Sequence, residues 1–325
     1  MVRQETTAGK PSSLEERSVK LQQLRYVLEI ALHDNHLSAA AQALNTSQPG
    51  VSRQIQMLEE ELGFEIFRRT RNRIIGLTEN GEHVLQIAKR VVTDVASLKD
   101  MKRELDSEGK GTLTIGTTHT QARYVLPRVI EPFVKAFPNV QLILTEGNPE
   151  DVCTLVDSGQ ADLAIGTDTT HKLPNLVRLP CFALPRSVVA PIGHPILAKE
   201  HITLEDVAAH PIITYDPRYS GRWRVMQAFR NAGLDPQIVL SAIDADVCKT
   251  YIGLGLGIGI LTTITFDPQR DIGLAARDAS HLFDPSMIYI TLRKNTYLRP
   301  YLLDFIGRLA EHLTPKTVRM ALQEA

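Results

Sequence analysis

The chain has few cysteines and no excess of charge of either sign. Its 325 residues include only Cys153, Cys181 and Cys248, which lie far apart and form no C-x-x-C pair. We therefore expect neither a disulfide framework nor a cysteine-based metal site, and a reducing compartment, the cytoplasm, fits best. The formal net charge is -1 at pH 7, so the overall charge does not itself indicate a nucleic-acid partner.

Long apolar runs are also missing. The first 20 residues are polar, and no later stretch approaches the length of a membrane span. We expect residues 1–20 to be a flexible extension, and we expect neither secretion nor a membrane partner. A chain of 325 residues with 43% hydrophobic and 22% charged content is expected to form two or three globular domains.

Residues 21–80 predict three helices. Apolar residues recur at helical spacing from Leu21, and a short second helix, with Ser38 as its expected N-cap, ends at Leu44. The third helix begins after Ser47, with Pro49 in its first turn, where a missing N–H costs little. Two short helices followed by a longer one are typical of a helix-turn-helix.

The third helix has one apolar and one polar face. At about 100° per residue, Val51, Ile55 and Leu58 share an arc that we expect to be buried. Polar residues dominate the opposite arc and the helix start, and their side chains can hydrogen-bond bases and phosphates. A polar outer face is also usual for any solvated helix. The candidate DNA-binding residues of this helix are Ser47, Gln48, Pro49, Ser52, Arg53 and Gln56.

A basic segment, "FRRTRNRIIGLTENG", follows this helix. Arg68, Arg69, Arg71 and Arg73 lie between the apolar residues Phe67 and Ile74. Short strands joined by a basic tip form a wing, and its arginines would neutralise DNA phosphates. The acidic run 59–61 is expected to lie away from these contacts.

Residues 81–108 predict a long linker helix. Val84, Ala88, Val91, Val95 and Leu98 recur every 3.5 residues on average, which favours pairing with a second copy of the chain. The alternative is that the helix packs on its own domain. Gly109 and Gly111 end the helix, and a domain boundary is expected near residue 110.

The segment "LQQLRYVLEIALHDNHLSAAAQALNTSQPGVSRQIQMLEEELGFEIFRR", followed by "LTENGE", resembles the amino-terminal domain of LysR-type transcriptional regulators. The resemblance implies an all-α winged helix-turn-helix that binds promoter DNA and dimerises through the linker helix. It also implies homotetramers and RNA polymerase as a partner.

Residues 112–325 predict an α/β effector-binding domain, because strands and helices alternate along the chain. The chain order suggests two subdomains, one built from residues 112–184 and 285–325 and the other from residues 185–284. Two crossings between them would form a hinge, as in periplasmic solute-binding proteins.

Hydroxyl-rich loops follow three of the expected strands, including "TTHTQARY" at residues 117–124. Strand ends that meet helix amino termini favour small anions, and Thr118, Thr120 and Gln121 suit an oxyanion. Helix capping is the alternative role for these residues.

An enzyme is not expected. In "GLGLGIGIL" a helix precedes a strand, which is the reverse of the order that a dinucleotide loop requires. His119 lacks an Asp or Glu in its sequence neighbourhood and no nucleophile motif appears, so a supporting role in hydrogen bonding is expected. No cofactor or metal is predicted, and a transport module would need the signal sequence that is missing here.

"TTHTQARY" and "DADVCKTYIGLGLGIGIL" resemble the CysB group of LysR-type regulators. The resemblance implies an activator of sulfur assimilation and cysteine biosynthesis whose effector is sulfate, thiosulfate, O-acetylserine, N-acetylserine or adenylyl sulfate. A sister branch that regulates sulfonate use shares the first motif, and the altered loop at residues 216–218 leaves the effector open. The implied effector-binding residues are Thr117, Thr118, Thr120, Gln121, Thr167, Ser220 and Asp246.

Overall fold

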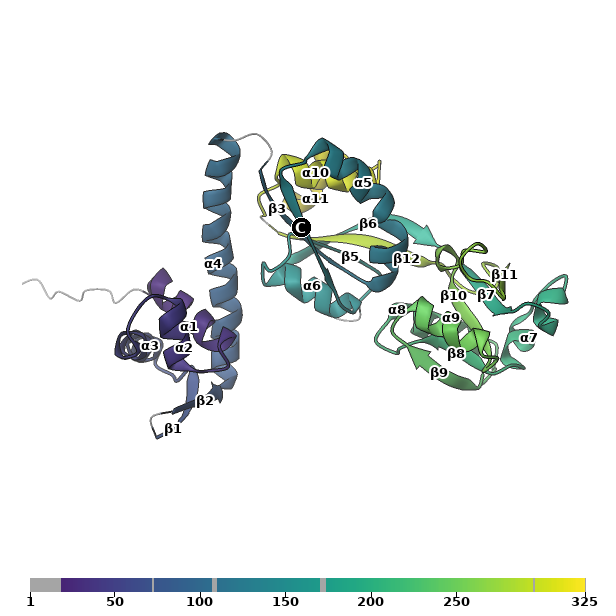
Figure 1. The fold of residues 1–325 in the computed structure, drawn as a ribbon, viewed down its shortest axis with the longest axis horizontal. Coiled ribbons are helices and arrows are strands. Elements are labelled where there is room, and N and C mark those ends of the chain that lie inside the picture. Colours follow the sequence, from purple (N-terminus) through teal and green to yellow (C-terminus); the bar gives the residue numbers. More distant parts are fainter. Residues whose placement is uncertain (1–18, 72, 107–109, 170–173, 295, 325) are drawn as a thin grey trace, which may run out of the picture. The chain divides into compact units, whose positions relative to one another are not determined.

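The computed structural model describes residues 19–71, 73–106, 110–169, 174–294 and 296–324 (Figure 1). Most of the expected extension, residues 1–18, lies outside the described residues. The chain forms two compact units, residues 1–92 and 93–325, and each is described by itself.

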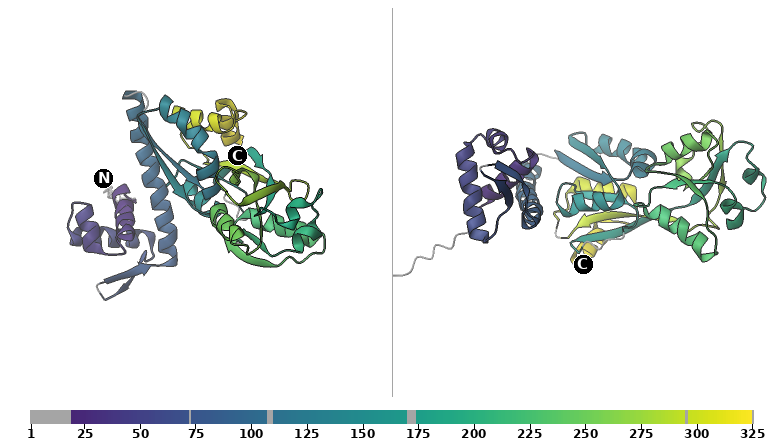
Figure 2. Two further views of the ribbon diagram at one scale, coloured as in Figure 1. Left: turned by 45° about the vertical axis from the view of Figure 1, so that its right-hand side comes forward. Right: turned by 90° about the horizontal axis from the view of Figure 1, so that it is seen from below.

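The first unit is the expected winged helix-turn-helix. An apolar core joins its three helices to the hairpin and includes Val27, Ile30, Ile55 and Phe67. The two strands pair antiparallel, and in Figure 2 the hairpin extends away from the helices as a wing. The elements are α1 (Leu21–Leu32), α2 (Leu37–Ala43), α3 (Gln48–Leu62), β1 (Phe67–Thr70), β2 (Arg73–Leu77) and the start of α4 (Glu79–Asp106).

The helix caps agree with the sequence at α3 but not at α2. The Ser47 hydroxyl accepts a hydrogen bond from the N–H of Gly50 at 3.3 Å, so the expected cap of α3 is confirmed. The expectation for Ser38 was wrong, because the N-cap of α2 is His36, two residues earlier, and Ser38 lies inside the helix. The Ser38 hydroxyl instead donates to the side-chain oxygen of Gln48 at 3.4 Å, an acceptor from the next helix that local sequence does not reveal.

The apolar residues of helix α4 are divided between a buried part and an exposed part. Val84 belongs to the core of the first unit, so the beginning of the stripe packs on its own domain. Further along, Ile87 and Leu98 are 47% and 64% exposed. These two side chains are available to a second copy of the chain.

The second unit contains two five-stranded sheets, and the lobe built on each is named after its order in the chain. In the first lobe β3 is parallel to β4 and β5, while β12 is antiparallel to β5 and β6. Helices α5, α10 and α11 cover one face of this sheet, and α6 covers the other (Figure 1). The elements are β3 (Gly111–Thr117), α5 (Pro127–Ala136), β4 (Val140–Glu146), α6 (Pro149–Asp157), β5 (Leu163–Gly166), β6 (Leu176–Leu184), β12 (Ser286–Arg293), α10 (Pro300–Leu309) and α11 (Pro315–Glu324).

In the second lobe the strand order is β11-β7-β10-β8-β9. Helix α9 packs on one face of this sheet, and α7 and α8 pack on the other. Only Pro185 separates β6 of the first lobe from β7 of the second, and the chain returns to the first lobe at β12. The predicted α/β fold with two subdomains is therefore confirmed. The elements are β7 (Arg186–Pro191), α7 (Leu204–Ala208), β8 (Ile212–Tyr215), α8 (Ser220–Asn231), β9 (Ile238–Ala242), α9 (Ala245–Gly253), β10 (Ile258–Thr262) and β11 (Leu274–Asp278), with short 3-10 helices at Pro195–Ala198 and Thr263–Thr265.

The helix expected after "TTHT" begins with a wider turn than an α-helix. Residues Gln121–Val125 form a π-helical turn, in which the N–H of Leu126 donates to the carbonyl of Gln121 at 2.8 Å. Pro127, which has no N–H, then starts α5. Such turns are frequent at functional sites, and this one adjoins the polar loop.

Candidate functional site

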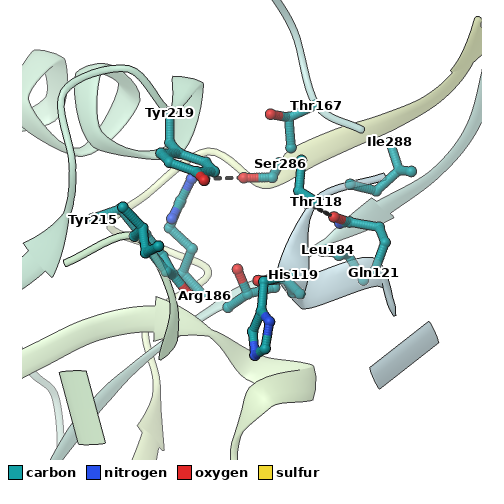
Figure 3. A pocket seen from close by; sticks show the side chains of 14 residues that line it. Thr118, His119, Gln121, Thr167, Leu184, Arg186, Tyr215, Tyr219, Ser286 and Ile288 are labelled. Carbon is teal, nitrogen blue, oxygen red and sulfur yellow. Dashed lines mark hydrogen bonds between the residues drawn. The ribbon is translucent and has the colours of Figure 1, made fainter. Parts of the chain in front are cut away.

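A small cavity lies between the two lobes (Figure 3), with a volume of about 30 Å³. All three of the loops that follow strands β3, β8 and β9 contribute residues to its wall. The residues that line it are Thr118, His119, Thr120, Gln121, Thr167, Leu184, Arg186, Tyr215, Tyr219, Gly221, Ile243, Thr262, Ser286 and Ile288.

The loop after β3 supplies a neutral polar wall. Thr118 and Gln121 are 5% and 2% exposed, and the Thr118 hydroxyl donates to the side-chain oxygen of Gln121. Thr120 and Thr167 also face the cavity. Hydroxyl and amide groups can donate hydrogen bonds to an oxyanion without adding a formal charge.

Thr117, the first residue of the loop motif, does not line the cavity. It is fully buried, and its hydroxyl donates to the carbonyl of Ile165 at 3.1 Å. Thr117 therefore joins the neighbouring strands β3 and β5, which differs from the expectation that it contacts effector. Successive side chains of a strand point to opposite faces of the sheet, so Thr117 and Thr118 at the end of β3 cannot both face the cavity.

Arg186 is one of the cavity residues that were not predicted from the sequence, and it carries the strongest charge among them. It begins β7 and is 0% exposed. Its Nε donates to the carbonyl of Asp284 at 3.2 Å and its Nη2 to the Ser286 hydroxyl at 2.7 Å, while Nη1 has no hydrogen-bond partner among the described residues. Burial lowers the pKa of the guanidinium to about 10, so it stays charged at neutral pH. The sequence offered one sign of this residue: a single arginine stands close to the apolar run "VVA", which is typical of a buried strand.

The start of α8 makes room for this guanidinium. A Cβ atom at Gly221 would lie 3.2 Å from Arg186 Nη2, so a side chain there would crowd it. Ser220 is 5% exposed, and its hydroxyl has no partner within the described part of the chain. Ser220 is not itself part of the cavity surface, although its neighbour is.

Asp246 also lies outside the cavity wall and instead holds the lobes together. Its carboxylate accepts a hydrogen bond from the Tyr124 hydroxyl at 2.7 Å and pairs with Arg123 Nε at 3.0 Å, both from the first lobe. Within its own lobe it lies 3.3 Å from Lys249 Nζ. Burial alone would raise the pKa of Asp246, but the Tyr124 hydroxyl and the Lys249 and Arg123 charges lower it overall.

His119 has the hydrogen-bonding role that was expected, and its partners are acidic residues from distant parts of the sequence. Its Nδ1 lies 3.0 Å from Glu146 Oε2, and its Nε2 lies 3.4 Å from Asp246 Oδ2. These acids are 27 and 127 positions away in the chain, so only the fold brings them together. Burial opposes the charged imidazole, but the hydrogen bonds to Glu146 and Asp246 outweigh it and raise the pKa of His119.

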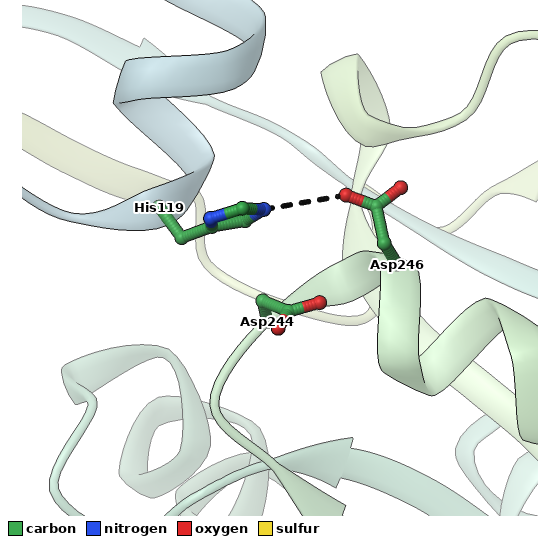
Figure 4. A group of neighbouring side chains, drawn as sticks. All are labelled: His119, Asp244 and Asp246. Atoms are coloured by element: carbon green, nitrogen blue, oxygen red, sulfur yellow. Dashed lines mark hydrogen bonds and ion pairs between the residues drawn. The ribbon is translucent and has the colours of Figure 1, made fainter. Parts of the chain in front are cut away.

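His119, Asp244 and Asp246 offer ligand atoms within 4.8 Å of one another, a spacing that could hold a metal ion (Figure 4). Their other contacts oppose this use. Asp244 Oδ1 caps α9 by accepting from the N–H of Val247 at 2.8 Å, and Lys249 and Arg123 already neutralise Asp246. A cation would have to displace both basic groups.

The first unit presents the polar face expected of a recognition helix. Val51, Ile55 and Leu58 of α3 are 0% exposed and point into the core. On the outer side and at the helix start, Ser47, Gln48, Pro49, Arg53 and Gln56 are exposed and Ser52 is half-buried.

The four wing arginines are not equivalent. The side chains of Arg68, Arg71 and Arg73 are exposed and form no hydrogen bond or ion pair with other described residues, although the backbones of Arg68 and Arg73 belong to the β1–β2 hairpin. Arg69 Nη2 instead lies 2.7 Å from Glu59 Oε2. The other oxygen of Glu59 accepts the backbone N–H groups of residues 66 and 67 at 2.9 and 3.1 Å. Glu59 thus connects α3 to the wing.

Two family descriptions match the two units of the chain. Residues 21–82 match the bacterial regulatory helix-turn-helix protein of the lysR family, and residues 106–314 match the LysR substrate binding domain. The chain belongs to the LysR family of transcriptional regulators.

Relatives within this LysR family cover nearly the whole chain. The chain is 44% identical to the HTH-type transcriptional regulator SsuR of Burkholderia cenocepacia over 94% of its own length and 100% of the relative's. It is also 44% identical to CysB of the same organism, over 94% and 97% of the two chains. The crystal structure of the cofactor-binding domain of the Cbl transcriptional regulator is 38% identical, covers 67% of this chain and 96% of that domain, and has a TM-score of 0.65. The resemblance to the CysB-like branch is confirmed.

The three cysteines of this LysR protein are free thiols. Burial raises the pKa of Cys181 and of Cys248 to about 12, and it also raises that of Cys153. Thiols that stay protonated react slowly with oxidants. Among the described helices, none is both long and apolar enough to cross a bilayer.

Proposed function

We propose that this LysR protein regulates genes of sulfur metabolism, as an activator, in response to a small oxyanion bound between its lobes. The effector-binding residues are Thr118, Thr120, Gln121 and Thr167, which line the cavity, and Ser220, whose hydroxyl has no partner in the ranges that the structure describes and lies just behind the wall beside Gly221. The observation that carries the proposal is a cavity of about 30 Å³ whose wall combines neutral donors with one buried arginine.

The size of the cavity ranks the candidate effectors. A volume of 30 Å³ is about two to three times the 10–15 Å³ that one water molecule needs. Sulfate and thiosulfate are compact enough for such a space. O-acetylserine and N-acetylserine are larger, and adenylyl sulfate requires the lobes to separate. We therefore favour an inorganic sulfur oxyanion.

The DNA-binding role rests on α3 and the wing. Arg53 and Gln56 are exposed beside Ser52 on the outer face of α3, where they can reach base edges. Arg68, Arg71 and Arg73 are free to contact phosphates. We further propose that α4 pairs two copies of the chain through the side that carries Ile87 and Leu98, that dimers associate into tetramers, and that the DNA-bound protein contacts RNA polymerase.

Effector binding acts through the arrangement of the lobes. Hydrogen bonds and ion pairs from Asp246 already join the lobes in this conformation. An oxyanion that contacts both lobes binds this arrangement more tightly than an open one. A difference of about 1.4 kcal/mol changes the ratio of the two arrangements tenfold, which a few polar contacts supply.

Two titrations test the proposal. Isothermal calorimetry with sulfate, thiosulfate and both acetylserines measures effector binding, and a gel shift at fixed salt measures promoter binding. We expect Arg53→Ala to lose promoter affinity with effector binding intact. Binding of none of these anions to the wild-type protein would contradict the assigned effector class. Transcript levels in a deletion strain grown on sulfate or on sulfonates identify which sulfur genes depend on the protein.

A further inference from the structure

Arg186 is bonded to both of the segments that connect the lobes. It follows Pro185 directly, at the point where the chain first crosses to the second lobe. Its partners, the Asp284 carbonyl and the Ser286 hydroxyl, lie on the segment by which the chain returns. Figure 3 shows the guanidinium reaching from the second lobe toward Ser286 at the cavity wall. Any contact that moves Arg186 therefore acts on both crossings.

Arg186 has no ion-pair partner within the described part of the chain, and the Asp284 carboxylate acts on its charge only from beyond ion-pair distance. No ion pair there includes Arg186, and its bonding partners are a carbonyl and a hydroxyl, both uncharged. The only other ionisable basic group in the cavity wall is His119, which already has Glu146 and Asp246 as partners. A buried cation without a direct ion-pair partner is unfavourable, and an anion in the cavity would relieve that cost.

We propose that Arg186 determines the specificity of this site, by giving its free Nη1 donor and its positive charge to the bound oxyanion. This proposal rests on the proposed function, and the property by which the site selects its ligand is negative charge. The preferred ligand is a compact anion, and an uncharged molecule of the same shape is rejected. Because the same guanidinium holds both crossings, the anion also fixes the relative position of the lobes.

The shape of the guanidinium explains why lysine cannot replace it. The planar group uses Nε for Asp284 and Nη2 for Ser286, and it leaves Nη1 buried beside the cavity without a partner among the described residues. A lysine ammonium is a point charge on a flexible chain and does not reproduce this fork. Gly221 preserves the space beside Nη2.

The test compares Arg186→Gln and Arg186→Lys with Arg277→Gln as the matched control. Arg277 is also held by backbone carbonyls, those of Leu197, Lys199 and Glu200, but it lies outside the cavity wall. Calorimetry measures the affinity of the full-length proteins for sulfate. Trp223, the one tryptophan, lies two residues beyond Gly221 and reports binding by fluorescence.

We expect Arg186→Gln to bind sulfate about 10- to 100-fold more weakly, Arg186→Lys to recover only part of the loss, and Arg277→Gln to match wild type. The wild-type protein should bind sulfate at least tenfold more tightly than dimethyl sulfone, an uncharged molecule of similar shape. That comparison uses only the wild-type protein. It therefore tests whether the site selects for charge even if circular dichroism shows that Arg186→Gln is unfolded. Equal affinity for sulfate and sulfone would overturn the inference.

The outcomes also separate this inference from the function on which it rests. If the wild-type protein binds neither sulfate nor thiosulfate, the proposed effector is wrong. If wild type binds sulfate and folded Arg186→Gln binds it equally well, the sensor role stands and the role of Arg186 is refuted.

Discussion

The arginines of the wing and the arginine of the cavity carry the same charge in opposite surroundings. Arg68, Arg71 and Arg73 are exposed to solvent, whereas Arg186 is 0% exposed. Salt screens exposed charges strongly and buried ones weakly. The exposed arginines are suited to DNA, a long polyanion with mobile counterions. The buried arginine is suited to a single small anion that has lost its water. The two regions should therefore respond differently to the same change of conditions.

The largest expected difference is in the dependence on salt. If three arginines from each of two paired heads contact phosphates, promoter affinity should fall about 10³-fold between roughly 50 and 200 mM salt. Sulfate affinity should change by less than about threefold over the same range, because the site is buried. Fluorescence anisotropy with labelled promoter DNA and calorimetry with sulfate measure the two slopes in chloride buffers. If promoter affinity and sulfate affinity fall equally steeply with salt, the exposure of the arginines does not determine the salt dependence of binding.

The next largest effect is expected within the cavity wall. Thr118→Ala removes a hydroxyl from the site and leaves the Gln121 oxygen without its donor, so sulfate should bind about 10- to 100-fold more weakly. Effector-free promoter affinity should not change, because the first unit is untouched. Thr117→Ala is the matched control, since its hydroxyl bonds Ile165 and not the cavity. It should lower thermal stability with sulfate affinity retained, and the reverse pattern would refute this division of roles.

A smaller effect should separate the wing arginines from one another. Arg69→Ala removes the partner of Glu59 and should destabilise the first unit by about 1 kcal/mol, a value kept small because the pair is partly exposed. Arg71→Ala should leave stability unchanged and reduce the salt slope of promoter binding by about one. Thermal unfolding by circular dichroism and the anisotropy slopes test both. Equal slopes for the two variants would mean that Arg69 contacts phosphate despite its ion pair.

The features that the sequence predicted are those set by neighbouring residues. The helical phase of Val51, Ile55 and Leu58 indicated the face of α3, because residues three and four apart share a helix side. The polar loop at Thr118 to Gln121 was recognisable because the strand, the loop and the helix are consecutive. Even so, the wide π turn that follows this loop was not predicted, since its hydrogen bonds need no special residue.

The features that the sequence did not predict depend on distant pairs. Arg186 and Ser286 are 100 positions apart, and Arg186 looks like an interruption in an apolar strand until both crossings are seen together. His119 looked isolated because Asp246 is 127 positions away. Thr117 differs from these two residues, because the alternation of side chains along β3, a local property, already turns it away from the cavity.

The smallest expected effect concerns His119, the other ionisable basic group in the cavity wall. It faces Glu146 from β4 and Asp244 and Asp246 from the loop and first turn of α9, where Lys249 and Arg123 also meet Asp246. Its pKa is raised above 6.5, so the folded protein binds the proton more tightly than the unfolded chain. The stabilisation by charged His119 is therefore fully present below pH 6.5 and is lost as the pH rises through the raised pKa.

We expect His119→Gln to lower the thermal midpoint of the effector domain at pH values below 6.5 and to have progressively less effect as the pH rises through the raised pKa of His119. Because the His119 side chain is 34% exposed, the accompanying change in sulfate affinity should be at most about fivefold. Glu146→Gln is the control, since it removes a carboxylate partner and should reduce the same pH dependence while keeping the imidazole. The contribution of Arg186 to sulfate affinity should be present at every pH below about 10, where its guanidinium is charged. The contribution of His119 should be present only at pH values where its imidazole is charged. If the difference in thermal midpoint between wild type and His119→Gln grows as the pH rises, charged His119 does not stabilise the folded protein.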